Sequence, residues 1–486
     1  MHGSCKHCLQ LAVRRQHNTC AATPQAPSAR MPTMDAVNPA TEEVVSRHPE
    51  HTTVQVAGLL ERAGRAAREW RQTPIERRTA VLAKAAEALR RGSRDLAATV
   101  TREMGKPIGQ SEAEIEKCAL GCDYYATHAA AHLAPEVVGT DADRSYVCYE
   151  PLGAVLAIMP WNFPFWQVFR FAAPALAAGN VAVLKHAPNV PGCALAIERI
   201  FKEAGVPDGV FTTLLVDASA VESIIQNPVI AAVTLTGSGR AGRAVAGHAG
   251  RALKKTVLEL GGSDPFIVLP DADVQATAKA AAGTRCLNAG QSCIAAKRFI
   301  VVGDAKPFAD ALASQMSALR VGDPTDRSVE VGPLARRDLL ENLQSQVERS
   351  IKAGARPLAG GHLLPRKGFY FAPTVLTDVR PGMPAFDEET FGPVAAVIAA
   401  KDVDDAVSLA NHTPYGLGAS IWTKDVALGE RLASRIEAGS VFVNGPVKSD
   451  PRLPFGGIKQ SGYGRELARA GILEFVNMKT VWVKRA

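Results

Sequence analysis

The spacing of apolar residues predicts three amphipathic helices near the start of the chain. Apolar residues recur every three or four positions over 54–70, 75–100 and 108–132, the period of a helix with one buried face. Pro74 stands where it can open the second helix, because the first turn of a helix needs no N–H there. Over 144–150 apolar and polar residues alternate instead, which predicts an exposed strand or hairpin.

Four continuous apolar runs follow, with helical stretches between them. They cover residues 152–159, 180–184, 210–216 and 230–235. Strands that are buried on both faces read as unbroken apolar runs, and helices between such strands imply parallel pairing. The chain therefore predicts an α/β fold with a doubly wound parallel sheet.

A glycine-rich turn joins the fourth run to a helix. Gly237, Gly239 and Gly242 form the pattern G-x-G-x-x-G between a strand and a helix, the context in which this pattern binds dinucleotides. A helix start attracts phosphates through its backbone N–H groups, but a tight helix–strand junction without a ligand would need the same glycines. Glu259 follows at the distance of a ribose-binding acid. It fits either that role or a catalytic carboxylate, and the spacing leaves both open.

A second candidate site is the stretch Asn288-Ala-Gly-Gln-Ser-Cys293. It lies between an apolar helical run, 274–282, and an apolar strand, 298–302. A thiol at such a junction can face a cleft, and Gly290 lets backbone amides approach the group that the sulfur attacks. Free cysteines are also among the most buried residues, so packing is the alternative role for Cys293.

The composition is that of a soluble globular protein with more than one subdomain. The chain has 486 residues, 47% of them hydrophobic and 21% charged. The net charge of +7 is spread along the chain without a basic block, which argues against nucleic-acid binding. No apolar run is long enough to span a membrane. The nine scattered cysteines favour a reducing compartment, and we expect a cytoplasmic protein.

Residues 1–33 differ from the rest because they are polar, carry several arginines and contain no acid. This is typical of a transit peptide, although a disordered tail or a translation start placed too early would look the same. Cys5-x-x-Cys8 and His17-x-x-Cys20 imitate the spacing of zinc ligands, but the loop between the pairs is short. We predict no metal site in the chain and leave this segment out of the fold.

Six motifs in a fixed order decide between the open alternatives. They are Pro160-Trp-Asn-Phe-Pro164, Leu184-Lys185, Leu258-Glu-Leu-Gly-Gly262, Gly290-Gln-Ser-Cys293, Glu389-Thr-Phe-Gly-Pro393 and Pro454-Phe-Gly-Gly-Ile-Lys-Gln-Ser-Gly462. Together they make residues 34–486 resemble the NAD(P)-dependent aldehyde dehydrogenase superfamily. The run Leu-Lys-His-Ala-Pro-Asn at 184–189 is similar to a branch of the bacterial succinate-semialdehyde dehydrogenases.

This resemblance implies an acyl-enzyme mechanism. Cys293 corresponds to the nucleophile that attacks the aldehyde to form a thiohemiacetal and then a thioester. Asn162 corresponds to the amide that stabilises the oxyanion together with the backbone N–H of the nucleophile. Glu259 corresponds to the general base that activates water for hydrolysis. The resemblance therefore assigns Glu259 to catalysis and not to the ribose.

The resemblance also implies a modified Rossmann arrangement that binds NAD or NADP. Contacts to the cofactor are implied for Trp161, Lys185, Gly237, Ser238, Gly242 and Glu389. In many NAD-specific members a glutamate follows three residues after the lysine that holds the adenosine ribose. Pro188 stands there in this chain and cannot repel a 2′-phosphate, so NADP is not excluded.

The substrate carboxylate is assigned by the same resemblance to Arg170 and Ser449. The alternative role for Arg170 is an ion pair with an acid of the catalytic domain. Some of these enzymes carry a further arginine for the substrate six residues before the nucleophile, where this chain has Leu287. Arg285 or Arg452 could supply the missing charge, and the alternative role for each is a surface salt bridge. Succinate semialdehyde is the expected substrate, with glutarate semialdehyde or a broad range of aliphatic aldehydes as alternatives.

The implied domains are a cofactor-binding domain over 34–135 and 152–257, a catalytic α/β domain over 258–465, and a small β bridging element from 136–151 and 466–486. The bridging element leaves an unpaired apolar strand edge, so we expect a homodimer or homotetramer.

Two other classes of function stay open. One is a CoA-acylating or hydrolytic cysteine enzyme, against which the general-base glutamate speaks. The other is a non-enzymatic binding protein, against which the complete set of catalytic positions speaks.

Overall fold

The computed structural model describes residues 32–485. The transit-peptide, tail and zinc-spacing interpretations of the N-terminal segment therefore lie outside the described residues. Thr33 already begins a strand, β1 (Thr33–Asn38), which pairs in antiparallel fashion with β2 (Glu43–Pro49).

The four apolar runs form four adjacent strands of a six-stranded sheet. Its strand order is β19-β9-β8-β5-β6-β7. The strands are β5 (Ala154–Met159), β6 (Val181–His186), β7 (Phe211–Leu214), β8 (Ile230–Thr236), β9 (Lys255–Glu259) and β19 (Gly462–Tyr463). Strands β5 to β9 pair in parallel, and only the short β19 is antiparallel. The prediction of a doubly wound parallel sheet is confirmed.

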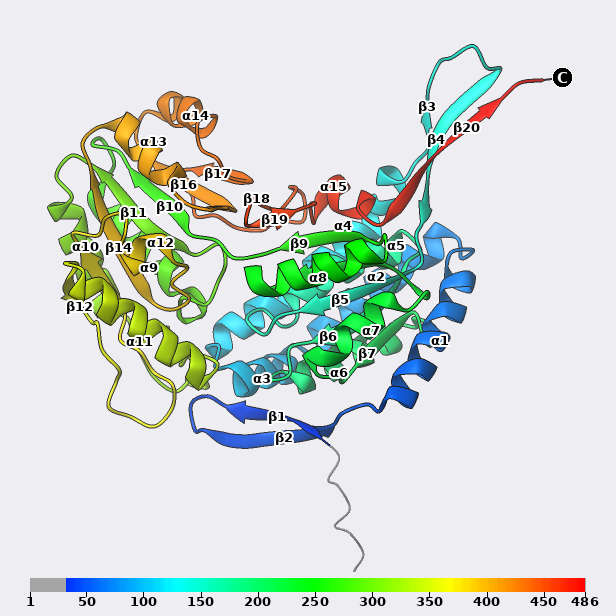
Figure 1. Cartoon of the computed structure of the whole chain (residues 1–486), viewed down its shortest axis with the longest axis horizontal. Helices are drawn as coiled ribbons and strands as arrows, with labels where there is room; N and C mark the ends of the chain where they lie inside the picture. The colour runs from blue at the N-terminus through cyan, green and yellow to red at the C-terminus, as the bar shows by residue number, and fades with distance from the viewer. Residues whose placement is uncertain (1–31, 486) are drawn as a thin grey trace, which may run out of the picture. The chain divides into compact units, whose positions relative to one another are not determined.

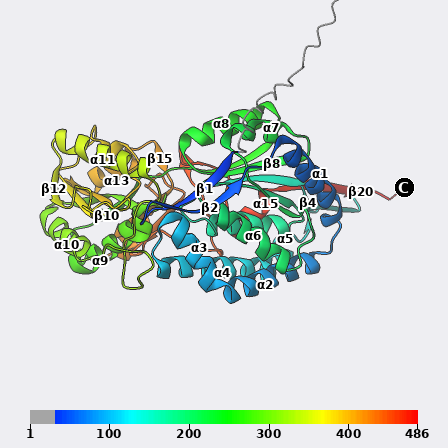
Figure 2. The ribbon, with the colours of Figure 1, turned by 90° about the horizontal axis from the view of Figure 1, so that it is seen from below.

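Helices cover both faces of this sheet, with α7 and α8 on one side and α2 and α4 on the other (Figure 2). The helices of this region are α1 (Thr53–Trp70), α2 (Ile75–Arg91), α3 (Ser93–Met104), α4 (Ile108–His132), α5 (Trp166–Ala177), α6 (Pro191–Glu203), the 3₁₀ turn η1 (Ala218–Ala220), α7 (Val221–Gln226) and α8 (Gly239–Arg251). The helix expected over 75–100 is two helices, because the chain breaks at Gly92 (φ −89°, ψ 2°). Glycine costs about 1 kcal/mol relative to alanine inside a helix, which favours a break there.

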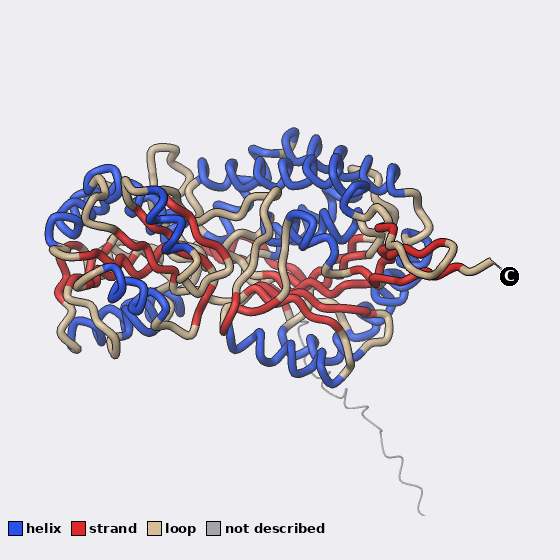
Figure 3. The backbone as a smooth tube through the Cα atoms, turned by 90° about the horizontal axis from the view of Figure 1, so that it is seen from above, coloured by secondary structure: helices blue, strands red, loops and turns tan. Residues whose placement is uncertain are grey.

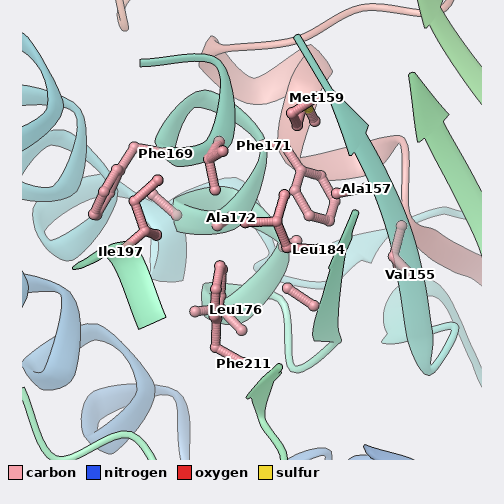
Figure 4. Packing of buried hydrophobic residues seen from close by; sticks show 14 of the residues in the cluster. Val155, Ala157, Met159, Phe169, Phe171, Ala172, Leu176, Leu184, Ile197 and Phe211 are labelled. Atoms are coloured by element: carbon pink, nitrogen blue, oxygen red, sulfur yellow. The ribbon is translucent and has the colours of Figure 1, made fainter. Parts of the chain in front are cut away.

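The core of this half forms around α5, whose residues are all buried. The helix lies against β5 and β6 on one side and α4 on the other. Figure 4 shows Ala172 and Leu176 of α5 beside Leu184 of β6 and Phe211 of β7. Because α5 begins just after the β5 loop, this packing fixes the position of the residues that follow β5.

A second sheet has the order β12-β13-β14-β11-β10-β16-β17 and is parallel except for β12. Its strands are β10 (Asp264–Val268), β11 (Ala296–Val302), β12 (Arg356–Ala359), β13 (Thr374–Thr377), β14 (Val394–Ala400), β16 (Gly418–Trp422) and β17 (Ser440–Val443). Its helices are α9 (Val274–Cys286), η2 (Leu287–Gly290), α10 (Lys306–Ser317), α11 (Arg337–Lys352), α12 (Pro384–Asp387), α13 (Val403–Asn411) and α14 (Val426–Ala433). Figure 3 shows the strands of each sheet as a band between helices.

Two separate hydrophobic cores correspond to the two sheets. The segment after β17 returns to the first core, where Phe455, Leu467 and Ile472 are buried. It contains β18 (Ile458–Lys459), which pairs with β15 (Tyr415–Gly416), then β19 and α15 (Ala468–Leu473). The last part of the segment 258–465, expected to belong to the catalytic domain, therefore shares the first sheet through β19 and the first core through Phe455.

A three-stranded antiparallel sheet of order β20-β4-β3 extends beyond the helices and carries the C-terminal end of the chain (Figure 1). Its strands are β3 (Glu136–Val137), β4 (Arg144–Pro151) and β20 (Val476–Val483). Val137, Met478 and Trp482 are exposed on it. The predicted pairing of the 144–150 strand with the C-terminal strand is present in the structure.

Candidate active site

The loop that carries Cys293 has a strained backbone. Asn288, Ala289 and Gly290 follow one another with φ values of 53°, 51° and 75°, in the left-handed region. A Cβ on Gly290 would lie 2.3 Å from the backbone oxygen of Gly392. The glycine is therefore required by this close approach as well as by its φ. Such strain is maintained only where the surroundings hold the loop firmly.

Lys297 is one of the groups that hold this loop. Its side chain is fully buried, and Nζ donates hydrogen bonds to the backbone oxygens of Ser292, Cys293 and Ala295 at 3.1, 2.9 and 3.2 Å. Nζ also lies 3.7 Å from the carboxylate of Glu389. One buried ammonium group thus uses all of its donors on the loop that carries Cys293, a role that the sequence analysis missed.

Arg285 holds the same loop from the helix side. Its guanidinium donates to the backbone oxygens of Ala296 at 3.0 Å and Gly290 at 2.5 Å. Its side chain is buried, so the surface salt bridge expected as its alternative role is wrong, and it lies outside the linings of both cavities described below. Arg452, in contrast, is exposed and ion-paired with Asp450 at 2.7 Å, as its surface interpretation predicts.

Asn162 is held in one orientation beside the loop that carries Cys293. Gln167 Nε2 donates to its Oδ1 at 3.1 Å, so its Nδ2 must face the opposite way and donates to the backbone oxygen of Gln291 at 3.0 Å. Asn288 Nδ2 donates to the backbone oxygen of Asn162 at 2.7 Å. The amide N–H₂ of Asn162 therefore points at the loop that carries the thiol.

The thiol of Cys293 is protonated at neutral pH in this environment. Burial raises its pKa to about 12, while the nearby charges of Arg170 and Lys297 lower it and those of Glu389 and Glu259 raise it. A thiol with so high a pKa is a poor nucleophile until a base or a bound ligand favours the thiolate.

Glu259 ends β9 and is buried, with no hydrogen-bond donor within the described chain for either carboxyl oxygen. Its Oε1 lies so close to Gly456 that a Cβ there would meet it at 2.7 Å. Burial raises the pKa of Glu259 well above its usual range, and the carboxylate of Glu466 raises it further, against Arg170. The group is therefore a proton acceptor only when its surroundings permit ionisation.

Two cavities meet at Cys293. One, of about 380 Å³, is lined on one side by Phe163, Trp166 and Phe455. The other, of about 390 Å³, opens along the ends of β5 and β8 and is lined by Trp161, Asn162, Gly237, Ser238, Glu389 and Arg336. The chain runs from β5 outward to β7 and then returns to β8, so this edge is the switch point at which open α/β sheets bind ligands.

Part of the glycine-rich turn borders the second cavity, and part of it packs against the sheet. Ser238 caps α8, and its Oγ accepts from the backbone N–H of Ala241 at 3.3 Å. A Cβ on Gly237 would meet nothing closer than 3.7 Å, so this residue borders open space. A Cβ on Gly242 would lie 2.6 Å from Leu260, and Gly242 does not line the cavity. Gly242 therefore serves the close contact of helix and strand.

The remaining predicted cofactor residues lie at different places. Glu389 Oε1 accepts from the backbone N–H of Gly262 at 3.0 Å, and burial raises its pKa. Lys185 is buried near the end of β6, outside the linings of both cavities. Sequence reasoning missed Phe391, which packs edge-on against Trp161 at 5.8 Å and lines the second cavity.

The predicted substrate residues both lie in the wall of the first cavity. Arg170 forms an ion pair with Glu466, and its guanidinium lies 4.6 Å from the ring centre of Phe455. Ser449 Oγ accepts from Lys117 Nζ at 2.7 Å. Lys117 was not expected, because it lies on α4 and belongs to none of the six motifs.

Comparison with known proteins gives a consistent result. A sequence profile of the aldehyde dehydrogenase family matches residues 26–481. A probable succinate-semialdehyde dehydrogenase [NADP(+)] of Synechocystis sp. is 52% identical, covering 92% of this chain and 99% of that protein. The succinate semialdehyde dehydrogenase [NAD(P)+] of Escherichia coli K12 is 49% identical, covering 93% and 98%.

The fold agrees as well. The crystal structure of succinic semialdehyde dehydrogenase from Streptococcus pyogenes, in complex with NADP+, superposes with a TM-score of 0.91 at 36% identity, covering 93% of this chain and all of that one.

No group of three or more His, Cys, Asp or Glu side chains in the described part of the chain could hold a metal ion. None of the helices within residues 32–485 is long and apolar enough to cross a membrane.

Proposed function

The chain belongs to the aldehyde dehydrogenase family, and we propose that it is an NAD(P)-dependent succinate-semialdehyde dehydrogenase. The observation that carries the proposal is the position of Cys293, where a cavity along the glycine-rich turn meets an apolar cavity with cations in its wall. Relatives about half identical to this chain bear the name of that activity.

The residues of the second cavity fit a nicotinamide cofactor. Gly237 borders open space, and the N-terminus of α8 beside Ser238 offers backbone N–H groups to a pyrophosphate. We assign Trp161 and Ser238 to the phosphates, Lys185 to the adenosine ribose and Glu389 to the nicotinamide ribose. When bound, the cofactor accepts the hydride that leaves the substrate carbon.

The first step belongs to Cys293. Its sulfur forms a bond to the aldehyde carbon as the thiol gives up its proton to solvent, the C=O π bond breaks, and negative charge develops on the aldehyde oxygen. The amide N–H₂ of Asn162, held in orientation by Gln167, and the backbone N–H of Cys293 stabilise this charge. Departure of the hydride then leaves a thioester on the sulfur.

Glu259 acts in the second step. Its carboxylate accepts a proton from a water molecule that attacks the thioester, which releases the carboxylic acid product and restores the thiol. Its unpartnered, buried oxygens support this assignment, because a base must have a free lone pair. A CoA-acylating enzyme would need no such base.

The substrate class follows from the first cavity. Apolar walls suit a short aliphatic chain. We assign Arg170 and Ser449 to the part of this wall that faces a distal carboxylate, Arg170 through its positive charge and Ser449 through its hydroxyl. Glutarate semialdehyde, one carbon longer, is the alternative substrate. NADP and NAD are both proposed as cofactors because Pro188 carries no charge, and relatives are named for NADP(+) and for NAD(P)+.

An aldehyde panel tests the proposal. Reduced cofactor is followed by absorbance with succinate semialdehyde, glutarate semialdehyde and butanal, each with NAD and NADP. We expect the carboxylate-bearing four-carbon aldehyde to give the highest kcat/KM and Cys293→Ala to be inactive. Equal rates for butanal would contradict the substrate assignment, and acyl-CoA formation in the presence of CoA would contradict the hydrolytic step.

We also propose the domain bounds 34–135 with 152–257, 258–465, and 136–151 with 466–486, a homodimer or homotetramer, and a cytoplasmic location. The exposed apolar residues Met478 and Trp482 on β20, at the edge of a three-stranded sheet, support self-association. Light scattering coupled to gel filtration measures the oligomeric state.

A further inference from the structure

Three cations lie in the wall of the cavity in front of Cys293: Lys117, Arg170 and Lys448. The charge of Arg170 is balanced by its ion pair with the buried carboxylate of Glu466. Lys448 is exposed to solvent. Lys117 is only partly exposed and forms no ion pair with any residue of the described chain.

The acids closest to Lys117 are already engaged elsewhere. Glu114, on the same helix, forms an ion pair with Lys106 and accepts hydrogen bonds from two backbone N–H groups at the start of α5, at 2.9 and 3.0 Å. Asp450 forms an ion pair with Arg452 at 2.7 Å. The ammonium group of Lys117 thus brings an uncompensated charge to the cavity.

Ser449 supplies a second donor at the same point. Its Oγ accepts from Lys117 Nζ at 2.7 Å and from the indole Nε1 of Trp166 at 3.0 Å. Lysine and tryptophan donate only, so both lone pairs of the hydroxyl oxygen are used and its proton is left to donate. That proton meets no acceptor among the hydrogen bonds within residues 32–485. An ammonium and a hydroxyl donor side by side match the two oxygens of a carboxylate.

We propose that Lys117 and Ser449 together bind the distal carboxylate of the substrate, with Trp166 fixing the direction of the Ser449 hydroxyl. This inference rests on the proposed function, since only a semialdehyde has such a carboxylate. Arg170, which is paired with Glu466, then adds positive electrostatic potential to the cavity without binding the carboxylate directly. Lys117 forms the ion pair with the carboxylate. Burial and the charge of Arg170 lower the pKa of Lys117 to about 8, and a bound carboxylate opposes this shift because its negative charge favours the protonated form.

The test compares Lys117→Met, Lys117→Arg and the matched control Lys84→Met, which removes a lysine from an exposed position on α2, with succinate semialdehyde and butanal as substrates. In Lys117→Met we expect kcat/KM for succinate semialdehyde to fall by about 10–150-fold, mostly through KM, because a charge-assisted contact is lost. Butanal should change by less than about threefold on the same reasoning. Lys117→Arg should recover most of the loss, and the control should behave as the wild type.

Inhibition by succinate, measured with butanal as the substrate, gives a second readout. Lys117→Met should weaken this inhibition by about the same factor as it raises KM. Equal loss for both aldehydes would show a structural lysine, and an unchanged preference for succinate semialdehyde would overturn the inference. A wild type without any preference for the carboxylate-bearing aldehyde would instead contradict the proposed function.

The pH dependence is a third readout. Lys117 carries its charge below its pKa of about 8 and loses it above. The groups around it are Arg170, Glu114, Asp450 and the buried thiol of Cys118. The ratio of kcat/KM for succinate semialdehyde to that for butanal should therefore fall above about pH 8 in the wild type and stay flat in Lys117→Met. A flat wild-type ratio would contradict the proposal.

Discussion

Substitution of Lys297 by methionine tests whether the nucleophile loop depends on one buried cation. The change keeps the length of the side chain and removes the three hydrogen bonds to the oxygens of Ser292, Cys293 and Ala295. It also leaves Glu389 without the ammonium group 3.7 Å from its carboxylate.

The magnitude follows from these contacts. Each buried carbonyl that loses its donor costs about 1–3 kcal/mol, and removal of one partner of a buried ion pair costs about 3–5 kcal/mol. Folding of the Lys297→Met protein no longer buries a charged ammonium group, and this offsets part of the cost. We therefore expect the free energy of unfolding to fall by about 3–5 kcal/mol. Because the loop is strained at Asn288 and Ala289, part of this loss should appear as displacement of the thiol.

Stopped-flow measurement of the first turnover detects that displacement. A shift of about 1 Å at the reacting atom can cost on the order of 10²-fold in rate, so the burst of reduced cofactor should slow by about that factor. Lys279→Met, which removes a lysine from an exposed position on α9, is the matched control. A Lys297→Met protein with a wild-type burst and a wild-type unfolding midpoint would refute the reasoning.

Three further predictions concern the proposed catalytic and cofactor residues. Glu259→Gln should leave the burst intact and slow thioester hydrolysis by about 10²–10⁴, whereas weak cofactor binding with normal turnover would assign Glu259 to the ribose. Since burial raises the pKa of Cys293 to about 12, its alkylation by iodoacetamide should accelerate about tenfold per pH unit from neutral to alkaline pH, and a flat profile would contradict this. NADP should be used within about a hundredfold of NAD, and Pro188→Glu should penalise NADP through charge repulsion. If the wild type preferred NAD over NADP by more than about a thousandfold, residues other than Pro188 would have to exclude the 2′-phosphate.

Much of the fold was predictable because local patterns agree with it. The unbroken apolar runs became β5, β6, β7 and β8, and the helix expected over 108–132 has those same bounds. Buried strands and amphipathic helices leave a periodic trace in the sequence, and tertiary packing did not override it. The break at Gly92 was missed, because helical periodicity continues across it and only the cap geometry marks the end.

The motifs alone predicted which residues belong to the proposed site around Cys293, because the family resemblance gives each motif residue a role. Only the tertiary structure assigned their partners. The sequence contains no sign that Arg285 and Lys297 hold the nucleophile loop, since each binds backbone oxygens, which carry no sequence signal. It likewise could not show that Gly242 serves packing against Leu260 rather than a ligand contact.

Lys117 is the clearest case of what only the tertiary structure decided. Its partner Ser449 lies more than three hundred positions away in the chain, near the start of the segment that leads from β17 back to the first core. Whether a lysine on a helix is a solvated surface group or an unbalanced charge in a cavity depends on which acids stand near it and which of them are already paired. Those pairings are contacts between distant segments, and no spacing along the sequence encodes them.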